Sequence, residues 1–265
     1  FYIFFMLTER TKQTILLFLA SFAALYFELI IIRYLSTELR IFAYLKNLPL
    51  IASFFGIGLG LLFNRIPRWL RFSFPFVLTA LFTIMSFAPH LNLTRIPFPR
   101  GDYFVWGSMP DVSSLISTCQ YFGVLIGITL LVVLFFAVLG GYIGQHFKAF
   151  PPLQAYAINL LGSIAGIGMF TLLSFLQADP PVWLFFGLTA IAPFFLPSTF
   201  EHQSAVQRNL IAAATAGIFA ISLVIVFSQR SPNVYWSPYY RIEIAPLSTQ
   251  TIPPNCSRFC RERNN

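Results

Sequence analysis

Charge is scarce in this chain. Asp, Glu, Lys and Arg together make up 10% of its 265 residues, and 57% of the residues are hydrophobic. Soluble globular proteins carry about 25% charged residues, and the mean hydropathy here is +0.74. The deficit of charge excludes an ordinary soluble domain and predicts a polytopic membrane protein.

Cysteine is also rare, and the motifs of soluble catalysis are missing. The three cysteines are Cys119, Cys256 and Cys260. An odd number with one loose Cys-x3-Cys spacing supports neither a disulfide framework nor a zinc site. The sequence contains no HExxH, no CxxC and no Ser/His/Asp order with a nucleophile elbow. We therefore expect this chain to bind no metal and no cofactor.

The net charge of +8 does not indicate nucleic-acid binding. The basic residues do not line one face. They form short clusters beside apolar runs, and the flanking cations include Arg65, Arg68 and Arg71 and also Arg33, Arg40 and Lys46. Such flanking cations contact anionic lipid headgroups and set the orientation of a membrane protein. The expected partner is the lipid bilayer, with no nucleic acid, and the sequence gives no oligomeric state.

Long apolar runs occupy most of the chain. About 20 apolar residues are needed to cross the hydrocarbon, and the backbone in lipid must satisfy its own hydrogen bonds, so these runs are predicted to be helices. The predicted spans are 14–32, 48–64, 69–88, 121–146, 153–176, 181–197 and 208–228. The second and sixth are short and contain Gly or Pro. The predicted fold class is an all-α polytopic membrane protein, a bundle of about seven transmembrane helices followed by a short β-strand.

Four segments organise the chain. Residues 1–13 form an N-terminal head with Met6 as a candidate natural start, 14–229 the helix bundle, 230–247 the first strand of a soluble domain, and 248–265 an irregular tail. Within the bundle, residues 33–47 are predicted either as an interfacial helix or as an extension of the first span, and 89–120 as a loop. Outside the tail, the Lys and Arg residues divide equally between the two sides, so their bias does not decide the orientation.

Glycines recur at four-residue spacing inside the apolar runs. Small residues at this spacing let two helices approach closely in a membrane. The same glycines lack the preceding strand and exposed helix start that a dinucleotide-binding loop requires. We expect helix packing at Gly56, Gly60, Gly140, Gly144, Gly162 and Gly166.

Polar side chains inside the spans are few. Tyr156, Asn159 and Ser163 share one face of a predicted helix, and this face is either a helix-packing seam or the wall of a substrate path. Glu28 is the single carboxylate well inside a span, and a buried acid is a functional candidate. It is expected either to face the polar seam at Asn159 and Ser163 or to be hydrated near the membrane edge. Glu28, Tyr156, Asn159 and Ser163 are the candidate substrate-binding residues.

Four stretches carry a resemblance to a known family: FELIIIRYLS, LPLIASFFGIGLG, YAINLLGSIAG and WSPYYRIEI. In this order they resemble the membrane-embedded spermidine synthase-like proteins, over about residues 14–247. The resemblance implies a helix bundle that precedes a cytosolic aminopropyltransferase-type domain with a Rossmann-like fold. Such a protein would transfer an aminopropyl group from decarboxylated S-adenosylmethionine to a polyamine. The resemblance also implies that the C-terminus lies in the cytoplasm and the bundle in an inner or plasma membrane.

The resemblance extends into the strand. Ser237, Tyr239 and Ile242 fall on the family's Ser-x-Tyr-Gln-x-Ile pattern, but Tyr240 stands where the family has a donor-binding Gln, so Tyr240 is at most a remnant of that site. The donor needs a Gly-rich turn and the amine needs carboxylates, whereas residues 230–265 contain two glutamates and no glycine. We expect a chain truncated at the start of the catalytic domain and inactive alone. The alternative is a transporter or permease-like protein for a small amine, in which the bundle itself is the functional unit.

Overall fold

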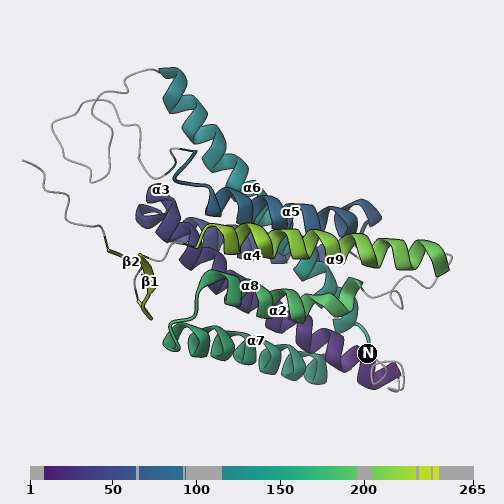
Figure 1. Ribbon diagram of the computed structural model, residues 1–265. Coiled ribbons are helices and arrows are strands. Elements are labelled where there is room, and N and C mark those ends of the chain that lie inside the picture. The colour runs from purple at the N-terminus through teal and green to yellow at the C-terminus, as the bar shows by residue number, and fades with distance from the viewer. Residues whose placement is uncertain are drawn as a thin grey trace, which may run out of the picture.

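The computed structural model describes residues 9–63, 66–91, 93, 115–195, 205–230, 233–239 and 241–244 (Figure 1). The helices are α2 (Glu9–Glu38), α3 (Arg40–Tyr44), α4 (Asn47–Leu62), α5 (Arg68–Ser86), α6 (Leu115–Phe147), α7 (Pro152–Phe175), α8 (Pro180–Ile191), the 3-10 helix η1 (Ala192–Phe195) and α9 (Ala205–Ser228). The strands are β1 (Val234–Trp236) and β2 (Arg241–Glu243).

Five of these helices are long and apolar enough to cross a membrane: α2, α5, α6, α7 and α9. A helix also lies at each of the two short predicted spans, but α4 has 16 residues and α8 has 12. Both fall below the length that a perpendicular crossing needs. The prediction of about seven spans is therefore not confirmed, whereas a mostly helical fold with several membrane-length helices is.

Two predicted boundaries move. The first span extends to Glu38, and a separate short helix, α3, follows it, so residues 33–47 are partly an extension of the span and partly a new helix. The predicted loop 89–120 ends earlier, because α6 begins at Leu115. Residues 94–114 lie outside the described part of the chain.

Helix α2 is the centre of the bundle. Its 30 residues extend over about 45 Å, and it packs against α7, α6, α8 and α3, with smaller contacts to α4 and α5. Rings from several helices meet beside it: Phe27 packs edge-on to Phe135 at 5.2 Å between centroids, and Phe135 stacks on Phe74 at 5.0 Å. The core is thus built of aromatic and branched side chains, as the abundance of Phe in the sequence implies.

Close helix contacts occur at several of the expected glycines. A Cβ at Gly60 on α4 would overlap the backbone of Ala137 on α6, and a Cβ at Gly162 on α7 would lie 2.5 Å from the carbonyl oxygen of Phe18 on α2. Real Cβ atoms essentially never approach a backbone atom so closely. Glycine at these positions lets α6 rest on α4 and α7 rest on α2, as small residues do between membrane helices.

The turn between α7 and α8 uses an unusual residue. Gln177 has a φ of 57°, in the left-handed region. Its N–H donates to the carbonyl of Ser174 at 3.1 Å, and the N–H of Ala178 donates to that of Leu173 at 3.0 Å. This is the Schellman pattern that ends a helix, with glutamine where glycine is usual. Two consecutive prolines, Pro180 and Pro181, then begin α8.

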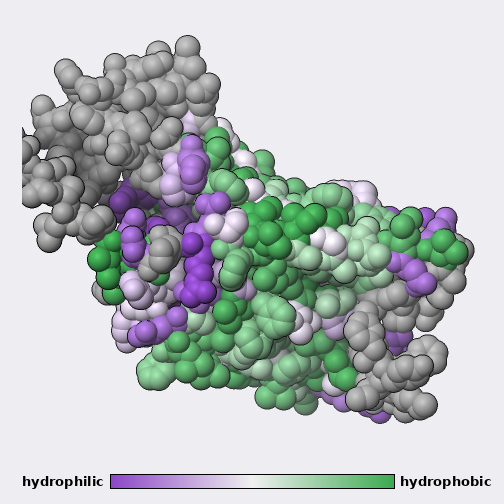
Figure 2. Space-filling model, viewed as in Figure 1, coloured by the Kyte–Doolittle hydropathy of each residue, from purple (hydrophilic) through white to green (hydrophobic). Residues whose placement is uncertain are grey.

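The polar residues gather at the ends of the bundle. Figure 2 shows apolar side chains along the flank of the helices and hydrophilic ones near the strands and at the opposite end. The strands pair antiparallel, with Tyr235 opposite Ile242, and so form a hairpin, where the sequence predicted a single strand. The hairpin lies at the end of the bundle where α2 ends and α8 begins (Figure 1).

Candidate functional site at the hairpin end of the bundle

Arg33 occupies an aromatic cage near the end of α2. Its guanidinium carbon lies 4.9 Å from the ring centroid of Trp183 on α8, 5.7 Å from that of Trp236 on β1 and 5.9 Å from that of Phe170 on α7. A guanidinium within about 6 Å of an aromatic face is attracted by the ring quadrupole, more strongly where water is excluded. One cation therefore joins two helices and the hairpin.

Hydrogen bonds reinforce this junction. The Arg33 guanidinium donates to the hydroxyl of Ser174 on α7 and to the backbone carbonyl of Ser237 just after β1. Trp236 is 6% exposed, and its ring packs edge-on to Trp183 at 5.0 Å and to Tyr34 at 6.0 Å. The hairpin is therefore seated on the bundle by a buried tryptophan and a caged arginine.

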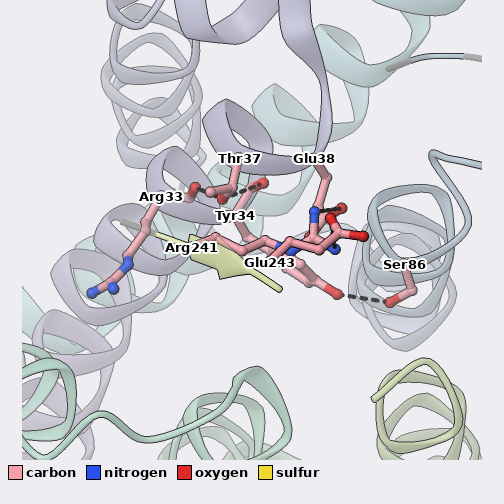
Figure 3. Close-up of polar contacts among 7 residues, drawn as sticks. All are labelled: Arg33, Tyr34, Thr37, Glu38, Ser86, Arg241 and Glu243. Atoms are coloured by element: carbon pink, nitrogen blue, oxygen red, sulfur yellow. Dashed lines mark hydrogen bonds and ion pairs between the residues drawn. The ribbon is translucent and has the colours of Figure 1, made fainter. Parts of the chain in front are cut away.

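An ion-pair network lies beside the cage (Figure 3). Arg241 on β2 lies 3.6 Å from a carboxylate oxygen of Glu38 and 3.7 Å from one of Glu243. Glu38 is buried, whereas the Glu243 side chain is 64% exposed. The same figure shows Arg33 pointing away from this network, and Tyr34 sharing a hydrogen bond of 3.1 Å with Ser86 of α5.

A small pocket opens between this network and the helix ends. Its volume is about 50 Å³, which is room for roughly three waters. It is lined by side chains of α2, the end of α9, the two residues after α9, the hairpin and the start of α8, and the charged ones among them are Glu38, Asp179, Arg230 and Arg241. Asp179 and Arg230 form an ion pair of 2.8 Å there. The pocket can hold water or one small polar group, and it is too small for an adenosyl donor.

The candidate carboxylate Glu28 lies elsewhere, about two-thirds of the way along α2. It is 4% exposed, and its Oε1 lies 2.7 Å from the hydroxyl of Ser53 on α4. The expected contact with Asn159 and Ser163 is wrong, because Glu28 faces α4, while α7 packs on a different side of α2. The alternative, that Glu28 is hydrated near the membrane edge, stays a prediction.

The other candidate residues lie on α7. Asn159 accepts a hydrogen bond of 2.7 Å from Ser21 of α2, so the polar seam contacts α2 through Ser21. Tyr156 is 58% exposed, and Ser163 is half-buried. The structure does not bring these three residues together with Glu28, and their role in substrate binding stays a prediction.

The remaining candidates concern the tail and metal binding. Tyr240 and residues 245–265 lie outside the described part of the chain, as do Cys256 and Cys260. Within the residues that the structure describes, no three His, Cys, Asp or Glu side chains gather in a group that could hold a metal ion.

Sequence reasoning missed the residues that seat the hairpin. Arg33 was interpreted as a flanking cation, and Trp183, Trp236, Glu38 and Arg241 received no role. The sequence holds one indication of this site. Arg33 and Glu38 follow a long apolar run, and Trp183 and Trp236, although far apart from each other, each lie near charged residues in the sequence. Their meeting depends on the path of the chain, which the local pattern does not give.

Comparisons with known proteins add no relative. No family model, no curated protein and no solved structure matches this chain.

Proposed function

We propose that this chain is the membrane-anchoring helical domain of a spermidine synthase-like protein. In the complete protein, an aminopropyltransferase-type domain would transfer an aminopropyl group from decarboxylated S-adenosylmethionine to a polyamine. The order of the four stretches that resemble this family supports the proposal, and the five membrane-length helices are compatible with an anchor.

The hairpin carries the proposal. A flexible tether between a membrane anchor and a soluble domain would keep its side chains in water. The hairpin instead buries Trp236 against Trp183 and Tyr34, and Arg33 bonds to the carbonyl of Ser237. A soluble domain that begins with these strands would be held in a fixed position on one face of the membrane.

The transporter alternative has one observation in its favour. Glu28 and Ser53 form a buried polar pair between α2 and α4, and ionisable residues inside a membrane commonly mark ion or substrate paths. However, Glu28 is 4% exposed and lines neither the pocket at the hairpin end nor a second hollow at the opposite end of the bundle. An anchor therefore fits the geometry better.

A flux and binding experiment separates the two functions. The purified chain is reconstituted into liposomes, and uptake of radiolabelled putrescine and spermidine is compared with protein-free liposomes. Thermal melting is measured with the same amines, because a ligand that binds the folded form raises the apparent stability. The anchor is expected to give no uptake above background and no shift. Uptake that Glu28→Gln abolishes would overturn the anchor and establish the transporter.

A further inference from the structure

Helix α7 lies at the edge of the bundle. It packs chiefly on α2, with a smaller contact to α6 (Figure 1). Gly162 and Gly166 press its inner side onto the backbone of α2 at Phe18 and Phe22. Near the end of α7, Phe170 also packs edge-on to Trp183 of α8 at 5.6 Å. Around Asn159 and Ser163 the outer side of α7 is open to whatever surrounds the protein, as the exposed side chains of Leu161 and Ile164 show.

Polar groups on one flank of α7 are left without partners. Among the described residues, the hydroxyls of Tyr156 and Ser163 make no hydrogen bond, and the side chain of Asn159 uses its oxygen to accept from Ser21. At least one N–H donor of the Asn159 amide is therefore left without a bond to any described residue. All three side chains are half-buried or exposed. The flank thus presents a row of unused donors.

In a membrane, these unsatisfied polar groups on α7 would cost free energy. If α7 spans a membrane, as the proposed function requires, Asn159 and Ser163 lie about 10 and 16 Å along the helix from its start at Pro152, at 1.5 Å per residue. At such depths there is no water to satisfy a donor, and an unsatisfied polar group facing hydrocarbon costs free energy. Thr171 on the same helix shows how a hydroxyl at an exposed position is usually satisfied, because it donates to the backbone carbonyl of Ile167 at 2.8 Å.

We propose that this flank of α7, defined by Tyr156, Asn159 and Ser163, is the interface through which two copies of this chain associate. The proposal rests on the membrane location in the proposed function and adds a partner to it. The three residues are spaced i, i+3 and i+7, which is the seam of a two-helix contact.

Self-association fits the chemistry of the row. In a two-fold dimer within a membrane, the symmetry axis brings each residue of the seam close to its own counterpart. An asparagine amide is both donor and acceptor, so two copies of Asn159 satisfy each other. The hydroxyls of Tyr156 and Ser163 are donor and acceptor as well, and interhelical hydrogen bonds of these types hold membrane helices together.

Cross-linking tests the location of the interface. In a cysteine-free version of the full chain, Ser163→Cys and Tyr156→Cys are introduced singly, and membranes are treated with a mild oxidant. Both variants are expected to give a disulfide-linked dimer. Val224→Cys on α9, which is 67% exposed, is the control and is expected to stay monomeric. Equal cross-linking at Val224→Cys, or none at either α7 position, would overturn the proposal.

Dilution in lipid tests the energetics. The fraction of dimer is measured by single-molecule photobleaching as the lipid-to-protein ratio rises. Asn159→Leu is expected to weaken dimerisation about 3- to 15-fold, the range that one interhelical hydrogen bond contributes, whereas Thr171→Val should leave it unchanged. Should Asn159→Leu fail to fold because Ser21 loses its partner, the double variant Tyr156→Phe with Ser163→Ala is used instead, and the same weakening is expected. It removes two hydroxyls that bond to no described residue of the same chain.

The outcomes separate this proposal from the anchor itself. A wild-type chain that stays in membranes after carbonate extraction but is monomeric at every dilution refutes the dimer alone. A chain that carbonate removes from the membrane refutes the proposed function, and the dimer proposal with it. A dimer whose stability is the same in wild type and in the α7 variants also refutes the α7 interface.

Discussion

At the scale of single residues, the buried pair of Glu28 and Ser53 shows what a lone carboxylate does among apolar helices. Ser53 is 1% exposed, and its hydroxyl lies 2.7 Å from Glu28 and 2.8 Å from the carbonyl of Leu50. A hydroxyl is the smallest side chain that can satisfy an acid without opening the packing between α2 and α4. The pair is a polar link between these helices, and its energy depends on both members being present.

Removing the Ser53 hydroxyl is expected to cost more when Glu28 is present than when it is absent. Ser53→Ala leaves the Glu28 carboxyl group buried without the hydroxyl that bonds to it, so we expect the free energy of unfolding to fall by about 1–3 kcal/mol. In a Glu28→Met background, the same Ser53→Ala change should cost less than about 1 kcal/mol, because nothing polar is then left unsatisfied. Thermal or denaturant unfolding of the four proteins in detergent measures this cycle.

A control lies on α5. Ser73 is half-buried and donates to the carbonyl of Leu70 in its own helix, at 3.0 Å. Ser73→Ala should change stability by less than about 0.5 kcal/mol, as surface substitutions usually do. If Ser53→Ala cost no more than Ser73→Ala, the link between Glu28 and Ser53 would contribute nothing to the bundle.

At this scale the position of the buried acid was predictable from the sequence, and its partner was not. Glu28 is a visible candidate because a carboxylate inside an apolar run can be recognised in a single sequence. The predicted neighbours, Asn159 and Ser163, were wrong, and the actual neighbour is Ser53. The position of Glu28 on α2 is fixed by helical periodicity, whereas its partner depends on which helix packs against that side. The cage around Arg33 escaped for the same reason, since Phe170, Trp183 and Trp236 are more than a hundred residues away from it in the sequence.

At the scale of elements, the contact of α4 with α6 depends on glycine. Gly56 and Gly60 on α4 face the backbone of α6 near Val133 and Ala137, and Gly140 on α6 faces Ile57. A short helix such as α4 buries little surface of its own, so close backbone contact adds the dispersion energy that it would otherwise lack.

Two glycines on the same turn of α4 make a matched test. At Gly60 a Cβ would overlap backbone atoms of α6, while at Gly58 it would meet nothing within 4 Å among the described atoms. We expect Gly60→Ala to lower the free energy of unfolding by about 1–3 kcal/mol through overpacking. Gly58→Ala should be neutral or stabilise by up to about 1 kcal/mol, because alanine favours the helix over glycine.

Thermal melting of the two variants in the same detergent measures the difference. Similar melting temperatures for both would mean that α4 can move away from α6 at little cost, and that the close contact does not hold the two helices together. The pair is informative because the chemical change is identical and the neighbourhood alone differs.

The sequence predicted the helices more reliably than the number of crossings. Long apolar runs placed a helix at each of the seven sites, because hydrophobicity and backbone hydrogen bonding dictate helix in such runs. It could not decide whether α4 and α8 cross, since that depends on tilt and on neighbouring helices. The hairpin was predicted as one strand because Pro238 and Tyr239 stand where its turn lies, inside a run that otherwise alternates like a strand.

At the scale of the whole molecule, the two ends of α2 define two polar ends of the bundle. Arg10 near its start bonds to Gln154 at 3.3 Å, and Gln13 lies 2.5 Å from the ring of His146. A hollow of about 620 Å³ opens beside them, lined in part by Lys148. The hairpin lies at the other end, about 45 Å away along the helix. Between the two ends, the flank of the bundle is apolar (Figure 2).

This arrangement predicts which residues share a membrane face. A cysteine-free chain with Tyr239→Cys carries its thiol on the hairpin, at a side chain that is 84% exposed. One with Gln145→Cys, also at an exposed position, carries it at the opposite end. A membrane-impermeant maleimide added to sealed vesicles should label one variant and spare the other, and vesicles of inverted orientation should reverse the result.

The family resemblance also predicts which end of the bundle faces the cytoplasm. An adenosyl donor is cytosolic, so Tyr239→Cys should react from the cytoplasmic side and Gln145→Cys from the other, with Leu130→Cys, 57% exposed in the middle of α6, unreactive from both. Labelling of the first two from the same side would mean that α2 does not cross the membrane. Reversed labelling would keep the bundle as a membrane domain but set the hairpin on the face where no adenosyl donor is available, and the anchor for an aminopropyltransferase would then be wrong.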